Sequence, residues 1–151
     1  MSRTKENKRK NQYLQSIVLS ADQQSKDNGL IRFNFKYYRF GDGGESFEQW
    51  QKDEILGDLN EKLKVFSHKS KVELMQDKTL ELYSGYPKGS KFKHPDDIPD
   101  EFVEWSRLRI AGKRRLIGFF WKNHNKQNDD VFYVVFLDKN HGFAPSEKKY
   151  T

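Results

Sequence analysis

Five basic side chains fall within nine consecutive positions of the segment EWSRLRIAGKRRLIGFFW (104–121): Arg107, Arg109, Lys113, Arg114 and Arg115. Arginine binds phosphate through a planar, bidentate fork, so arginines displayed on a sheet beside an aromatic side chain suit the backbone of a nucleic acid. The alternative is a solvated face whose basic groups pair with acidic groups from other elements. Composition alone leaves both interpretations open.

The period-two alternation of this segment, with a turn at AGK, predicts a β-hairpin and divides its charges between two faces. Arg107 and Arg109 share a face with Trp105. On the returning strand, Arg114 and Arg115 must point to opposite faces. Only one of these last two arginines can therefore contribute to a single site.

A histidine, His141, follows the hydrophobic strand expected at residues 130–138. Histidine is the side chain best suited to exchange a proton near neutral pH, although an ordinary exposed loop histidine is the alternative. The tail SEKKYT brings Lys148, Lys149 and Tyr150 close behind His141 in the chain. This tail either folds back over the same site or is simply solvated. No metal-binding motif is present in the sequence, and we expect neither a metal nor another cofactor.

The composition favours one soluble domain with an anionic partner. The chain has 151 residues, a net charge of +6 and no cysteine. A basic balance most often indicates nucleic acid as the partner, and less often an acidic protein or a membrane surface. No apolar run reaches the roughly 18 residues of a membrane span. The absence of cysteine fits a reducing compartment, and we expect a cytoplasmic protein.

The first part of the chain is expected to be a basic extension, residues 1–29, that precedes a domain of residues 30–151. Residues 1–12 indicate a frayed arm, and 13–20 a short helix or strand. A polar link then ends in a turn at Asn28–Gly29. The segment LIRFNFKYYRF (30–40) alternates, which predicts a strand with one buried face that carries Ile31, Phe33, Phe35 and Tyr37.

The middle of the chain predicts a helical hairpin. Leu56, Leu59, Leu63 and Phe66 recur at helical spacing within residues 46–67, with a kink expected near Gly57. Capping boxes begin this helix and a second short helix at 71–76, with Ser46 paired to Gln49 and Ser70 to Glu73.

Strands are expected at 79–84, in the hairpin and at 130–138, and the Pro- and Gly-containing segment 85–101 predicts a long surface loop. Sequential hairpins give an α+β domain. Its mostly antiparallel sheet of four to five strands carries the helical hairpin on one face.

This order of elements resembles the RelE/ParE superfamily of bacterial toxins. The strongest local match is WSRLRIAGKRRLIGFF followed by VFYVVFLDKNH, within residues 105–141. In that superfamily an R-x-R-I/L strand turns at a glycine and returns as Y-R-L/V-I/V. The long N-terminal extension and the 85–101 loop depart from the family pattern.

The resemblance implies a type II toxin that cleaves mRNA on the translating ribosome without a metal. In this reaction the RNA 2′-hydroxyl attacks the adjacent phosphate. Arg115 would then stabilise the phosphorane, and His141 would act as acid or base. Tyr150 matches more loosely a C-terminal tyrosine of some members. Arg107, Arg109 and Lys113, with Lys148 and Lys149 of the tail, would bind the RNA.

Two other functions remain open at this stage. A ParE-like protein shares the fold but inhibits DNA gyrase without catalysis, and a simple nucleic-acid-binding domain would share only the basic surface. For either kind of toxin, the resemblance implies a cognate antitoxin as a partner. We expect an acidic protein that covers the basic face.

Overall fold

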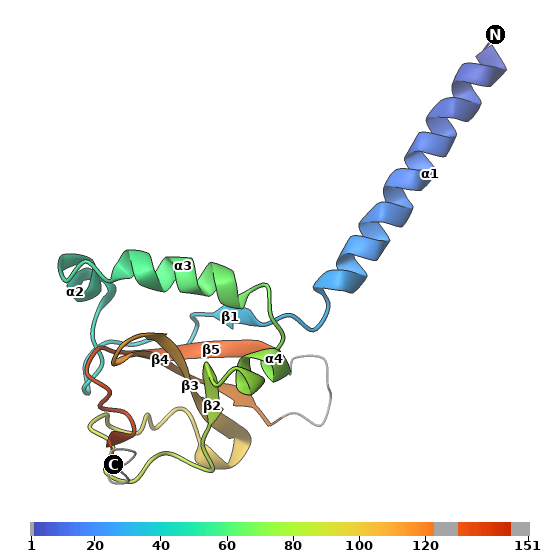
Figure 1. Ribbon diagram of the computed structural model, residues 1–151. Coiled ribbons are helices and arrows are strands. Elements are labelled where there is room, and N and C mark those ends of the chain that lie inside the picture. The colour runs from blue at the N-terminus through green and yellow to red at the C-terminus, as the bar shows by residue number, and fades with distance from the viewer. Residues whose placement is uncertain (1, 123–129, 146–151) are drawn as a thin grey trace.

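The computed structural model describes residues 2–122 and 130–145, which form an α+β domain and one projecting helix (Figure 1). The helices are α1 (Ser2–Asp27), α2 (Phe47–Lys52), α3 (Leu56–Phe66) and α4 (Lys71–Gln76), with a 3-10 turn at Asp100–Phe102. The strands are β1 (Arg32–Asn34), β2 (Leu80–Leu82), β3 (Val103–Ala111), β4 (Arg114–Trp121) and β5 (Val131–Asp138). The expected fold class is confirmed.

Five strands form one sheet in the order β1-β5-β4-β3-β2. Strands β2 to β5 pair antiparallel along the sheet, and β1 pairs in parallel with β5. The long central strands β3, β4 and β5 form the body of the sheet, whereas β1 and β2 are three-residue edge strands. Short edges of this kind limit unwanted pairing with other chains.

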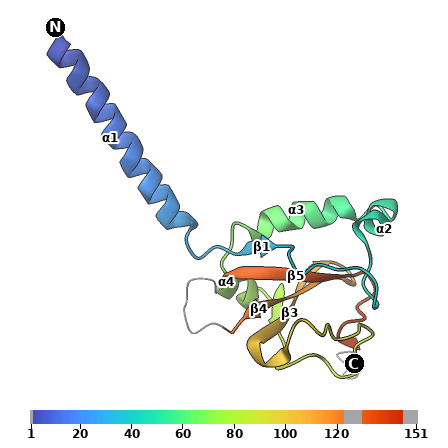
Figure 2. The same ribbon diagram turned by 180° about the vertical axis from the view of Figure 1, so that it is seen from behind.

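Helix α1 overturns the expectation of a frayed arm and a short 13–20 element, because one helix runs through Ser2–Asp27. These residues include neither glycine nor proline and are rich in lysine, glutamine and arginine, which favour helix. Gly29, at a φ of +86°, provides the expected turn after the helix. Figures 1 and 2 show α1 pointing away from the sheet. No helix in the described part of the chain is long and apolar enough to cross a bilayer.

The strand expected at 30–40 is wrong in length and in its single buried face. Strand β1 ends at Asn34, whose side chain accepts a hydrogen bond from the Lys36 backbone and so begins a turn. Phe35 is 42% exposed, whereas Tyr37 packs beneath the opposite side of the sheet from Ile31. A local Asx turn therefore overrides the period-two pattern.

Both expected capping boxes are present, at the starts of α2 and α4. The expected helix 46–67 is divided into α2 and α3, but the break does not lie at Gly57. It lies at Asp53–Ile55, where Glu54 adopts a φ of +60°, and Gly57 is inside α3.

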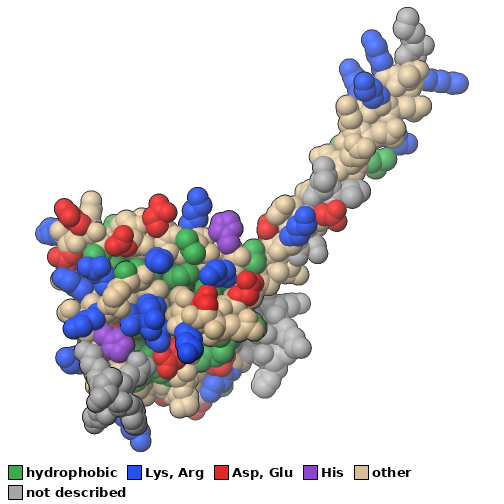
Figure 3. Space-filling model, in the orientation of Figure 1, with side chains coloured by type: hydrophobic (Ala, Val, Ile, Leu, Met, Phe, Trp, Pro, Cys, Tyr) green, Lys and Arg blue, Asp and Glu red, His purple; other side chains and the backbone are tan. Residues whose placement is uncertain are grey.

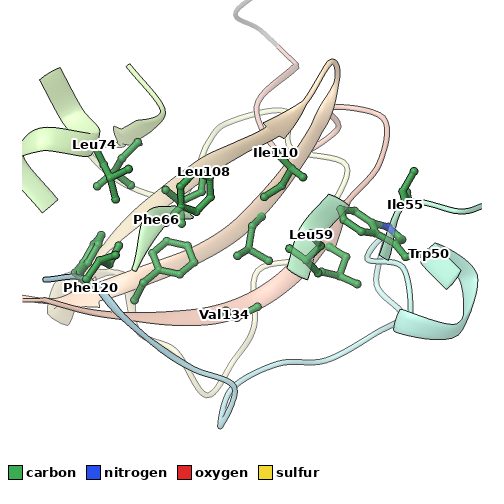
Figure 4. Close-up of a cluster of buried hydrophobic side chains, with 14 residues drawn as sticks. Trp50, Ile55, Leu59, Phe66, Leu74, Leu108, Ile110, Phe120 and Val134 are labelled. Atoms are coloured by element: carbon green, nitrogen blue, oxygen red, sulfur yellow. The ribbon is translucent and has the colours of Figure 1, made fainter. Parts of the chain in front are cut away.

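Helices α2, α3 and α4 cover one face of the sheet, as expected of the helical hairpin, and enclose the larger core (Figure 4). Leu59 and Phe66 of α3 point onto Leu108 and Ile110 of β3, while Trp50 closes one end. All five side chains are nearly inaccessible to water, so this layer supplies much of the hydrophobic stabilisation.

The opposite face of the sheet carries a second core, which the loop 85–101 covers. Phe92 and Ile98 of this loop are buried against sheet residues such as Phe119 and Phe136. Phe92 stacks on Phe136 with ring centroids 5.0 Å apart. The segment is a loop with many exposed positions, as expected, and it also packs these side chains against the sheet.

Candidate functional site

A row of charged residues crosses the sheet where β3, β4 and β5 meet the end of the second core. Arg109 of β3 lies opposite Arg115 of β4, which lies opposite Asp138 of β5. The hairpin alternation is confirmed, because Leu116 packs in the helix-covered core and Ile117 in the second core. Arg115 therefore shares the second face with Arg109 and Asp138, and Arg114 points to the other face.

Arg115 is a buried cation among other cations. It is 8% exposed, and burial is the main cause that lowers its pKa, followed by the positive charges of Arg107 and Arg109. Asp138 and Tyr83 partly oppose this shift. Nη1 donates hydrogen bonds to the backbone oxygens of Gly112 and Arg114. Nε is buried and has no hydrogen-bond partner among the described residues.

Arg107 and Arg109 differ in whether their guanidinium groups are already bound by other residues of the protein. Arg107 is 7% exposed, and its guanidinium forms an ion pair with Glu81 at 2.7 Å and donates to the Thr79 carbonyl. Arg109 is exposed, and no carboxylate of the described residues lies within ion-pair distance of it. Arg109 can therefore meet a phosphate directly, whereas Arg107 is held in place and contributes mainly positive potential.

Asp138 connects this row to His141. The buried Asp138 carboxylate accepts hydrogen bonds from the backbone N–H groups of Gly142 and Phe143, at 2.8 and 3.0 Å. These bonds close a turn in which His141 adopts a φ of +58°, a conformation uncommon for a non-glycine residue. Burial raises the pKa of Asp138, and the hydrogen bonds and the charge of His141 partly counteract this effect. Arg115 and His141 thus share Asp138 as an electrostatic neighbour.

The remaining expected site residues lie apart from this row or outside the described chain. Lys113 is exposed in the β3–β4 turn, close in sequence to the carbonyls that Arg115 binds. Lys148, Lys149 and Tyr150 lie outside the described residues, so their expected roles remain predictions. In the described part of the chain, no group of three or more His, Asp or Glu residues is arranged to hold a metal ion.

Two acids of the 85–101 loop stabilise the fold. Asp97 forms a two-point salt bridge with Arg39, at 2.6 and 2.9 Å. Asp100 accepts a hydrogen bond from Trp105 Nε1 at 2.7 Å and another from the Tyr86 backbone. Burial raises the pKa of Tyr86 to about 12, so its hydroxyl stays protonated and donates to the Phe92 carbonyl. These contacts fix the loop beside the charged row.

The sequence interpretation missed Asp138, the residue that connects Arg115 with His141. A carboxylate at the end of a buried strand, LD in VFYVVFLDKNH, was the available signal. Glu81 was also missed, because its pairing with Arg107 depends on the β2–β3 register.

Comparisons with known proteins give no relative from which to transfer a function. No protein-family model, no curated protein and no solved structure matches this chain. The functional argument therefore depends on the residues and geometry described above.

Proposed function

We propose that this chain is a RelE-like toxin: a metal-independent endoribonuclease that cuts mRNA on the translating ribosome and is neutralised by an acidic antitoxin. The observation that carries the proposal is Arg115. It is a buried guanidinium crowded by two further arginines, with an unpartnered Nε, and it shares Asp138 with His141. Burying several arginines together is unfavourable, because each loses its hydration and they repel one another. Such a cluster is typical of a site whose ligand supplies the negative charge.

The charged row supports each step of RNA cleavage by the substrate's own 2′-hydroxyl. Attack of this oxygen on the adjacent phosphorus forms a phosphorane, and the bond to the 5′-oxygen then breaks. Arg115 would stabilise the added negative charge of the phosphorane with a preorganised donor in a water-poor environment. His141 would take the proton from the 2′-hydroxyl or give one to the leaving 5′-oxygen, and solvent water would exchange the proton of the other oxygen. Arg109 would hold a neighbouring phosphate.

Asp138 has a positioning role in this scheme. Its two hydrogen bonds from Gly142 and Phe143 fix the turn that carries His141. Its charge also lies close to both His141 and Arg115. Asp138 therefore sets the relative placement of the proton-transfer group and the phosphate-binding group without contacting RNA.

The proposal is tested by expressing the wild type, Arg115→Ala and His141→Ala in bacteria and in a reconstituted translation system. We expect the wild type to arrest growth and to cut mRNA only when ribosomes translate it. Both variants should lose cleavage and toxicity while still unfolding in one cooperative transition within several degrees of the wild-type melting temperature.

Two outcomes would reject this function. Growth arrest that survives both substitutions would mean that the site is not catalytic. Continued translation together with DNA breaks would instead indicate inhibition of gyrase.

A further inference from the structure

The loop 85–101 divides into a basic half and an acidic half with different roles. Lys88, Lys91 and Lys93 lie in the first half, and no acid interrupts them between residues 88 and 93. Two acids of the second half, Asp97 and Asp100, are engaged in the contacts that fix the loop. The three lysines are exposed and form no ion pair with any described carboxylate. The first half of the loop therefore carries positive charge that no described ion pair neutralises, although the whole loop, with Asp96 and Glu101, holds more acids than lysines.

The fold presents two of these lysines on an anchored segment. Between them, Phe92 is 5% exposed and packs between Phe136 and Phe143, with centroids 5.0 and 6.1 Å away. Lys91 and Lys93 flank this buried ring, and both are exposed to solvent. Gly43 permits this packing, since a Cβ there would lie 2.3 Å from the Phe92 ring.

The same segment is joined directly to the turn that carries His141. The Lys91 backbone N–H donates to the Gly142 carbonyl at 2.9 Å, and the Gly142 N–H donates to Asp138 at 2.8 Å. The stem of the Lys91 side chain lies 3.4–3.5 Å from the position a Cβ of Gly142 would occupy. Lys91 thus adjoins the His141 turn on the loop side, while Arg109 and Arg115 approach Asp138 from the sheet side.

We propose that Lys91 and Lys93, with Lys88 at the start of the loop, form a second phosphate-binding surface of the site. Single-stranded RNA would then pass His141 with the loop lysines on one side and the sheet arginines on the other. This inference rests on the proposed function and adds a binding surface to it. From Arg109 to Asp138 the row spans two inter-strand spacings, about 10 Å, and the loop extends it further. Figure 3 shows lysine and arginine side chains gathered on one side of the globular part.

Lysine is suited to this role because the contacts are to a backbone of variable conformation. Its ammonium group is a flexible point charge, so it attracts phosphate without fixing one geometry. Removal of such a contact weakens binding similarly for all RNA sequences and reduces the salt dependence of affinity. An arginine near the reacting phosphate, by contrast, should affect the rate of cleavage.

The test compares Lys91→Ala/Lys93→Ala with a charge-matched control, Lys62→Ala/Lys64→Ala. The control lysines are exposed on α3, which covers the other face of the sheet. Binding of a fluorescein-labelled single-stranded RNA is measured by anisotropy across a salt series, and cleavage is measured during translation. We expect each loop lysine removed to weaken binding about fivefold, and the slope of log affinity against log salt to fall by about 1.4 for the pair. At saturating mRNA the cleavage rate should stay at the wild-type value.

The outcomes separate this inference from the proposed function. Suppose that the wild type cuts mRNA but the two pairs of substitutions weaken binding equally, or neither weakens it. The phosphate-binding surface on the loop is then refuted, and the proposed catalytic site is retained. If only the loop pair weakens RNA binding but the wild type never cuts mRNA, the RNA surface stands and the ribonuclease proposal fails. A wild type that neither binds nor cuts RNA refutes both.

Discussion

The Arg115 guanidinium gives the sharpest quantitative test of the site. A guanidinium donates from Nε, Nη1 and Nη2. The two hydrogen bonds that Arg115 makes to Gly112 and Arg114 both come from Nη1, and Nε has no partner in the described structure. Because Nε is also buried, the side chain would have to turn before its Nε–Nη2 edge could form a two-point contact with a phosphorane.

Lysine and alanine at position 115 should cause graded losses. Arg115→Lys keeps the charge but removes the fork, so at least one charge-assisted hydrogen bond is lost, at about 1.5–3 kcal/mol. This corresponds to a roughly ten- to hundredfold slower cleavage step. Arg115→Ala removes the charge as well, and we expect a loss of about 10²- to 10³-fold or more.

Stability should change much less than the rate. The variants lose the Nη1 bonds to a turn that water can reach, since Gly112 is exposed. Arg115→Ala also removes a buried charge that Arg107 and Arg109 repel, which offsets part of this loss. We expect its free energy of unfolding to stay within about 2 kcal/mol of the wild-type value.

Single-turnover cleavage of a ribosome-bound mRNA measures these rates, and urea denaturation checks the fold. Arg114→Ala is the matched control, because Arg114 is adjacent in sequence but faces the other side of the sheet, and its carbonyl still accepts from Arg115. Cleavage by Arg114→Ala should stay within about threefold of the wild type, as for surface substitutions. The argument is refuted if folded Arg115→Ala retains more than about a tenth of wild-type activity, or if Arg114→Ala is equally impaired.

Three further predictions concern the fold and its pH dependence. Folding raises the pKa of Asp138, so this residue adds stability at acid pH, and the added stability is lost as the pH rises through the folded-state pKa. Asp138→Asn should remove this part of the pH dependence of the free energy of unfolding, measured with urea. An unchanged pH dependence would contradict the assignment. Gly118→Ala should lower the free energy of unfolding by about 3 kcal/mol or more, because the new Cβ would lie 2.1 Å from the Tyr133 carbonyl oxygen. Gly89 is exposed and has a φ of +78°, so Gly89→Asn should be tolerated as the control. Deletion of residues 1–27 should shift the melting temperature by only a few degrees, since the described side chains of α1 are exposed; a large loss of stability would show that α1 supports the domain.

Local sequence signals located most elements correctly. Hydrophobic alternation gave the two faces of β3 and β4, and helical spacing gave the buried stripe of α3 with Leu59 and Phe66. The serine caps of α2 and α4 were also identified, because a capping box involves only residues three positions apart. These features depend on short-range geometry that any window of the chain reveals.

Composition misled the interpretation at two places, the helical α1 and the buried side of the loop 85–101, whereas the 30–40 strand failed because an Asx turn interrupts its alternation. Helix α1 forms from residues of high helix propensity although it buries little surface. The loop 85–101 is rich in proline and glycine, but Phe92 and Ile98 bury it against the sheet. In each case, composition was a weaker guide than backbone preference or a few large apolar side chains.

The sequence by itself determined the charge of the hairpin, the opposite orientation of Arg114 and Arg115, and the place of His141 after the last strand, because all three follow from residue type and a period of two. Only the tertiary structure decided that Asp138 joins Arg115 to the His141 turn, that Glu81 holds Arg107, and that Lys91 of the loop borders the same turn. The physical reason is that strand register and loop docking are set by packing between distant segments. No local pattern specifies those contacts.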